Sequence, residues 1–209
     1  EGTRGPVEMQ DVAADLAALL DALGGAEPIC YCGLSMGGYI GWQFLRRHGQ
    51  RVESLILCDT KATADTHEGI EARMKLANLV MEKGSEAAFD AMIFKLIADG
   101  SRHTRPEVVA ALRRVIVGTD PESIGAALRG MAARPDMTGL LKEIRVPTLV
   151  LVGRHDALTS PGEMRAMAEQ IEGATFVEIP DAGHMAPMEN SAAVNAAIAA
   201  FLEKGASIP

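Results

Sequence analysis

The sequence has 209 residues, which corresponds to one domain of ordinary size with enough chain for a hydrophobic core. Hydrophobic residues make up 48% and charged residues 23%, a balance that excludes disordered, collagen-like and coiled-coil chains. The formal net charge of -8 offers no basic surface to phosphate backbones or anionic lipids, so nucleic acid is not an expected partner.

The predicted elements alternate between helices and strands along the chain. Apolar residues at spacings of three and four indicate an amphipathic helix over 6–23, which a pair of glycines ends. A short apolar run over 29–34 predicts a strand. A tight turn at 35–38 then leads into a helix that ends near His48.

Three more apolar runs predict strands at 52–58, 147–152 and 175–179. Helical patterns separate each strand from the next, which predicts a parallel sheet with helices on both faces, the α/β class. After the third strand, Ser160-Pro161-Gly162-Glu163 supplies the residues of a capping box at a helix start. The last helix is expected to present one apolar face, made of Val194, Ile198, Phe201 and Leu202.

The long segment between residues 58 and 147 carries no strand signal and predicts a helical subdomain inserted between the second and third strands. Its expected helices cover 68–83, 85–98, 106–117 and 121–133. Thr104 with Glu107 is expected to start the helix at 106–117, and Asp120 with Pro121 is expected to start the helix at 121–133.

We expect the chain to divide into two core parts, 1–63 and 136–209, separated by a helical cap at 64–135. The methionines of this insertion are interpreted as flexible filling of its core, and lining of an apolar substrate cavity is the alternative. They are Met74, Met81, Met92 and Met131.

The three cysteines, Cys30, Cys32 and Cys58, lie in apolar runs of strand length. Their spacing is not that of a redox pair or a zinc site, so we interpret them as reduced thiols buried in a sheet, with a reactive thiol as the alternative.

No two histidines have the i, i+4 spacing of a zinc site, and we predict no metal and no cofactor. No apolar run approaches the roughly 18 residues that span a bilayer, and no secretory leader is evident, so we expect a cytoplasmic protein without a membrane partner.

The pentapeptide Gly33-Leu34-Ser35-Met36-Gly37 stands between the first predicted strand and the helix after it. A Gly-x-Ser-x-Gly pattern in that setting is typical of a nucleophile elbow, in which a strained turn exposes the serine hydroxyl. We expect Gly37, Gly38 and Gly41 to leave room where the helix and the strand come close.

A serine nucleophile needs a base, and the base needs an orienting carboxylate. The third predicted strand ends at Gly153-Arg154-His155-Asp156, and the fourth leads into Pro180-Asp181-Ala182-Gly183-His184. Because the carboxyl ends of parallel strands share one sheet edge, we expect Ser35, Asp156 and His184 to meet there. Asp59, which follows the second strand, is the alternative acid.

The chain resembles the α/β-hydrolase superfamily, specifically its small carboxylesterase and 3-oxoadipate enol-lactonase-like members. The resemblance covers essentially the whole chain, through Gly-Leu-Ser-Met-Gly-Gly at 33–38, Val-Gly-Arg-His-Asp at 152–156, Ala-Gly-His-Met at 182–185 and the helical insertion. It implies Ser35 as nucleophile, His184 as base, Asp156 as orienting acid and the Met36 backbone amide as one oxyanion donor.

The sequence departs from this family at its start, because members carry about four more strands ahead of the region seen here. A loop after one of those strands supplies the second oxyanion amide. We expect the chain to be the carboxy-terminal part of the fold, with an amino-terminal segment cleaved, disordered or omitted. The alternative is a short form whose open strand edge, at 29–34, pairs with a second copy in a homodimer.

Other polar residues near these motifs have plain interpretations. We interpret Asp181 as a loop carboxylate, His155 as a solvated or wall residue, and Trp42 and Tyr39 as packing residues. Glu189 is expected to be solvated or to cap the start of the last helix. No chemistry is assigned to the remaining histidines, His48, His67 and His103.

The leading hypothesis is a cofactor-independent serine hydrolase that cleaves a small or medium carboxylic ester or lactone through an acyl-enzyme. The resemblance keeps open relatives that cleave C–C bonds or make peracids, whereas haloalkane dehalogenases carry a carboxylate where Ser35 stands. A ligand-binding or scaffolding protein with a vestigial triad is the hypothesis from a different class.

Overall fold

A four-stranded parallel sheet forms the centre of the computed structural model, which describes residues 5–25 and 27–205. The strands lie side by side in chain order as β1 (Ile29–Leu34), β2 (Val52–Cys58), β3 (Thr148–Gly153) and β4 (Thr175–Ile179). The prediction of an α/β fold with a parallel sheet is confirmed. Only the third strand differs from its predicted bounds, by a single residue at each end.

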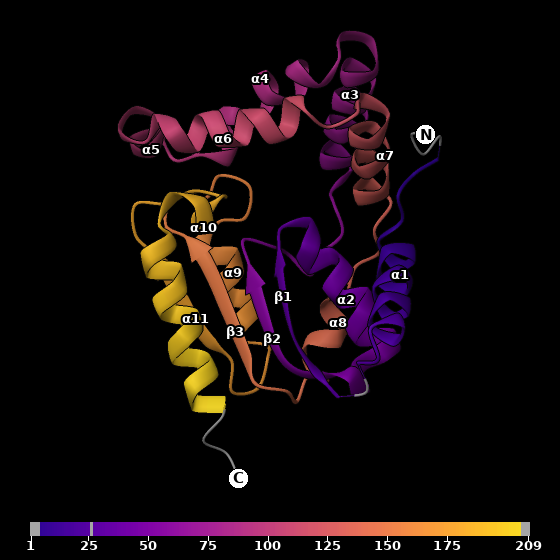
Figure 1. The fold of residues 1–209 in the computed structure, drawn as a ribbon, viewed down its shortest axis with the longest axis vertical. Helices are drawn as coiled ribbons and strands as arrows, with labels where there is room; N and C mark the ends of the chain where they lie inside the picture. Colours follow the sequence, from indigo (N-terminus) through magenta and orange to yellow (C-terminus); the bar gives the residue numbers. More distant parts are fainter. Residues whose placement is uncertain (1–4, 26, 206–209) are drawn as a thin grey trace.

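The carboxyl ends of the strands share one edge of this sheet (Figure 1). Leu34 pairs with Cys58, Cys58 pairs with Leu151, and Gly153 pairs with Ile179. The loops that follow these residues therefore begin next to one another, as expected for the site of a parallel α/β sheet.

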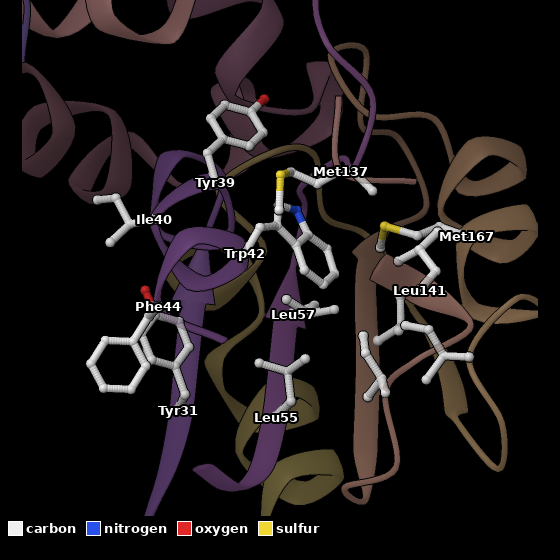
Figure 2. Packing of buried hydrophobic residues seen from close by; sticks show 14 of the residues in the cluster. Tyr31, Tyr39, Ile40, Trp42, Phe44, Leu55, Leu57, Met137, Leu141 and Met167 are labelled. Atoms are coloured by element: carbon white, nitrogen blue, oxygen red, sulfur yellow. The ribbon is translucent and has the colours of Figure 1, made fainter. Parts of the chain in front are cut away.

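Alternate residues of the buried strands face two separate cores, because successive side chains of a strand point to opposite faces. Leu55 and Leu57 belong to a large cluster that also contains Trp42 and Met167 (Figure 2). Ile56 lies in a smaller cluster on the other face. The large core involves α1 (Met9–Ala22), α2 (Met36–His48) and α9 (Pro161–Ala168), and the smaller one involves α11 (Ser191–Gly205).

Five of the helices between β2 and β3, α3 to α7, cover the carboxyl edge of the sheet (Figure 1). Four correspond to the predicted helices, and the six-residue α5 was not predicted. Phe89, Ile93 and Leu112 form part of a separate hydrophobic cluster within this layer. The helices are α3 (His67–Lys83), α4 (Ser85–Leu96), α5 (Asp99–Thr104), α6 (Pro106–Val117) and α7 (Pro121–Ala132).

Two of the three predicted helix caps are present. The Ser160 side chain and Glu163 form a complete capping box at α9, and Asp120 accepts a hydrogen bond from the Ser123 backbone at α7. The predicted cap at Thr104 is wrong, because its hydroxyl donates to the Gly100 carbonyl inside α5.

Three short elements complete the fold, a 3₁₀ turn at Gly49–Arg51, α8 (Thr138–Leu141) and α10 (Ala186–Glu189). None of the described helices is long and apolar enough to cross a membrane.

Two expectations about sulfur-containing side chains are wrong. Cys32 is exposed, because it lies on β1, the outer strand of the described sheet, while Cys30 is half-buried and Cys58 is buried. A hydrogen bond from the Cys58 thiol lowers the pKa of Cys32 to about 7. Met74 and Met81 of α3 are exposed rather than buried in the core of the insertion.

Candidate active site

Ser35 occupies a strained turn between β1 and α2. Its φ of 50° and ψ of -110° lie outside the ordinary regions for a non-glycine residue. Two contacts from β2 and the residues after it hold this turn. The Ser35 N–H donates to the Cys58 carbonyl at 2.9 Å, and the Thr60 hydroxyl donates to the Ser35 carbonyl at 2.7 Å. The strain is therefore supported by neighbouring structure and presents the hydroxyl at the sheet edge.

Three glycines make this turn and the helix after it possible. A Cβ at Gly33 would lie 2.5 Å from the Gly37 backbone, and one at Gly41 would lie 2.6 Å from the Tyr31 ring. A Cβ at Gly38 would collide with the Thr60 side chain. The expectation for Gly37 is wrong, because a Cβ there would meet nothing within 4 Å. The close approach thus depends on Gly33, Gly38 and Gly41.

The structure brings Ser35, His184 and Asp156 together in one hydrogen-bonded series. The Ser35 Oγ atom lies 2.8 Å from Nε2 of His184, and Nδ1 of His184 lies 2.9 Å from Oδ2 of Asp156. His184 and Asp156 are buried, while Ser35 is half-buried. The loops that carry Asp156 and His184 are joined directly, since the His155 N–H donates to the Ala182 carbonyl at 2.8 Å.

Asp156 is the ionised acid of this series. Its Oδ1 accepts the N–H groups of Leu158 and Thr159, at 2.7 and 3.0 Å, and its Oδ2 accepts the Thr159 hydroxyl. Burial opposes a charge here, but the hydrogen bonds from His184 and Thr159 outweigh it and hold the pKa of Asp156 below its ordinary value. An ionised Asp156 requires the proton on Nδ1 of His184, which leaves Nε2 free to accept a proton from Ser35.

The alternative acid, Asp59, lies beside this series but carries a different hydrogen bond. Its Oδ1 accepts the Gly153 N–H at 2.8 Å, and its Oδ2 is buried without a protein partner. Burial raises the pKa of Asp59 to about 9, and the nearby carboxyl groups of Asp156 and Glu189 add to that rise. Asp59 is therefore a neutral acid at pH 7, next to an ionised Asp156.

The Met36 amide lies at the start of α2, directly after Ser35. Met36 is the first residue of α2, and the first N–H groups of a helix have no acceptor within it. The helix dipole adds partial positive charge at the same end. The arrangement suits a negative charge that develops next to Ser35.

The remaining sequence-predicted residues lie outside the hydrogen-bonded series. Asp181 and His155 are exposed. They line a cavity of about 750 Å³ between α4, α5 and the loops after β3 and β4. Ser35 is not among the residues that line this cavity. Trp42 and Tyr39 are buried, as interpreted. Among the described residues, the acidic and histidine side chains close enough to share a metal ion are Asp59, Asp156 and His184.

Two residues that support the site were missed. Thr159 was not assigned any role, although a hydroxyl three residues after Asp156 is well placed to fold back onto its carboxylate. The expectation for Glu189 is wrong. Its side chain is completely buried, and its carboxylate accepts the backbone N–H groups of Gly183 and Ala98 instead of capping α11.

Comparison with known proteins identifies related sequences along nearly all of this chain. The family model described as serine aminopeptidase, S33, matches residues 1–191. 3-Oxoadipate enol-lactonase 2 of Acinetobacter baylyi is 26% identical over 200 residues, which make up 96% of this chain and 73% of that protein.

Two similar solved structures come from an esterase and a lactonase. The malate-bound esterase of Thermogutta terrifontis is 43% identical with a TM-score of 0.94, covering 97% of this chain and 75% of that one. The enol-lactonase of Burkholderia xenovorans LB400 is 32% identical with a TM-score of 0.86, covering 97% of this chain and 76% of that one. The described fold thus corresponds to a large part of both structures.

Proposed function

Because this chain belongs to the serine aminopeptidase S33 family of α/β-hydrolases, we propose that it cleaves small or medium carboxylic esters or lactones through an acyl-enzyme. The observation that carries the proposal is the series from Ser35 Oγ to His184 Nε2 at 2.8 Å and from His184 Nδ1 to Asp156 Oδ2 at 2.9 Å. In this proposal His184 is the general base, and Asp156 fixes its tautomer and orientation.

In the first half of the reaction, Ser35 attacks the carbonyl carbon while Nε2 of His184 takes its proton. The Met36 amide donates to the oxyanion that forms. Collapse of the tetrahedral intermediate expels the alcohol, which receives the proton from His184. Water then attacks the ester on Ser35 by the same steps, and the acid is released.

The names of the similar proteins support esters and lactones as the substrate class. One sequence relative and one solved structure are enol-lactonases, and another solved structure is an esterase. We assign helices α3–α7 as a cap that forms one wall of the substrate site, because they cover the sheet edge where Ser35 lies (Figure 1).

The test compares wild-type protein, Ser35→Ala and the matched surface variant Ser191→Ala on p-nitrophenyl esters of increasing acyl length and on simple lactones. We expect hydrolysis by wild type and Ser191→Ala, and its loss by at least about a thousandfold in Ser35→Ala. Equal turnover by Ser35→Ala and wild type would contradict the proposal. A protein that binds lactones but neither hydrolyses them nor reacts with a fluorophosphonate would instead be a binding protein with an inactive site.

A further inference from the structure

Glu189 is a buried side chain whose two carboxyl oxygens each accept a backbone N–H. It lies in α10, five residues after His184, and its side chain is 0% exposed. Oε1 accepts the Gly183 N–H at 2.8 Å, and Oε2 accepts the Ala98 N–H at 2.9 Å. Within the described residues, neither lysine nor arginine pairs with it. Burial of a carboxylate is costly, so both hydrogen bonds are needed to hold this group in place.

The two amides belong to different parts of the molecule. Gly183 directly precedes His184, whereas Ala98 joins α4 to α5 in the helical insertion. A Cβ at Gly183 would lie 2.7 Å from the Ala98 nitrogen, so this approach requires a glycine. Glu189 therefore connects the backbone of the histidine loop to the insertion.

Further contacts join the same two segments. The Met185 N–H donates to the Leu96 carbonyl at 3.0 Å, and the Ser101 hydroxyl donates to the Asp181 carbonyl at 3.2 Å. Met185 and Met188 pack against the hydrophobic cluster of the insertion. The loop that carries His184 is thus held by the insertion on one side and by the loop of Asp156 on the other.

We propose that Glu189 is a positioning residue for His184, and that through Glu189 the helical insertion sets the place of the imidazole. This inference rests on the proposed function, in which His184 transfers protons. Glu189 acts through the Gly183 backbone and does not touch Ser35. Reaction rates depend steeply on the placement of a general base, so a small displacement of the histidine loop lowers kcat.

The test uses Glu189→Gln, which keeps the shape of the side chain but replaces one accepting oxygen with an NH₂ group, so that a donor faces one of the two backbone N–H groups. On p-nitrophenyl butyrate we expect kcat to fall by more than about tenfold while KM changes by less than about twofold. The reaction of Ser35 with a fluorophosphonate should slow in parallel. The matched control is Glu178→Gln on β4, which removes only an ion pair with Arg154 and should behave as wild type.

Gly183→Ala tests the same contact from the other side, because its methyl group must push Ala98 away. We expect a similar loss in kcat. In the variant that carries both Gly183→Ala and Glu189→Gln, the fold-loss in kcat should be smaller than the product of the two single fold-losses. Unfolding midpoints measured alongside show whether each protein is folded at the assay temperature. Folded Glu189→Gln with wild-type kcat would overturn the inference, and if that variant does not fold, wild-type kcat in Gly183→Ala overturns it. Failure of the proposed function would give a different result, because Ser35→Ala would then hydrolyse the ester as fast as wild type.

Discussion

Asp59 and Asp156 place two buried carboxyl groups beside one imidazole, but only Asp156 is hydrogen-bonded to it. The difference follows from their surroundings. Asp156 receives hydrogen bonds on both oxygens, whereas Asp59 accepts one N–H and has one buried oxygen without a protein partner. One group therefore carries the negative charge and the other keeps its proton.

This division predicts different results for the two asparagine variants. Asp156→Asn should lower kcat by about 10⁴-fold, because the imidazole then loses the acceptor that fixes its tautomer. Asp59→Asn should keep kcat within about threefold, because a neutral amide replaces a neutral acid. Steady-state hydrolysis of p-nitrophenyl butyrate measures both. Near-normal turnover by Asp156→Asn would show that Asp59 serves as the acid.

The same division predicts how stability changes with pH. The pKa of Asp59 is about 9 in the folded protein and about 3.9 when unfolded, so between these values the unfolded chain holds fewer protons. The stability linked to Asp59 is fully present below about pH 4 and is lost as pH rises toward 9. Relative to Asp59→Asn, wild type should lose about 2 to 4 kcal/mol between pH 5 and 8. Urea unfolding at several pH values measures this, and parallel profiles for the two proteins would contradict it.

The elbow predicts that Gly38 does not tolerate a side chain. In Gly38→Ala the new Cβ would displace Thr60, whose hydroxyl holds the Ser35 carbonyl. We expect a loss of about 1 to 3 kcal/mol in the free energy of unfolding and a lower kcat. Gly162→Ala is the control, because a Cβ there meets nothing within 4 Å. Equal stability and activity in both variants would show that the turn adapts.

Two segments connect the insertion to the core, and an ion pair between buried Arg134 and half-buried Asp65 joins them. Arg134 donates to Asp65 at 2.7 Å and to the Thr63 carbonyl, and its guanidinium lies 4.1 Å from the Tyr39 ring. Arg134→Met should destabilise the protein by about 1.5 to 3 kcal/mol, because it removes the hydrogen bonds of Arg134 while Asp65 keeps its ion pair with Arg73. Thermal unfolding measures the loss, and the exposed variant Arg145→Met is the control. A wild-type unfolding midpoint for Arg134→Met would contradict this role.

Local sequence patterns were sufficient for the sheet and for the three central side chains. Apolar runs such as 52–58 mark buried strands, and parallel strands bring their carboxyl ends to one edge, so Ser35, Asp156 and His184 could be grouped before their distances were known. The role of Glu189 could not be read in the same way. Its partner Ala98 lies 91 residues away, in a segment whose placement depends on how the insertion packs.

Other failures have similar physical causes. Helix α5 has no apolar periodicity over Asp99–Thr104 and depends on packing against α6. Cys32 has the apolar neighbours of a buried residue, but its exposure is set by the place of β1 in the sheet order. Periodicity identifies the elements of this fold, whereas contacts between distant segments decide how they are completed.

Acylation of Ser35 can be measured directly by rapid mixing with p-nitrophenyl butyrate, followed by acid quenching and peptide mass analysis. We expect a burst of p-nitrophenol close to one equivalent per protein and a butyryl group on the peptide that contains Ser35. His184→Ala should show neither. Hydrolysis by wild type without any acylated Ser35, under conditions that trap the intermediate, would show that Ser35 is not the nucleophile.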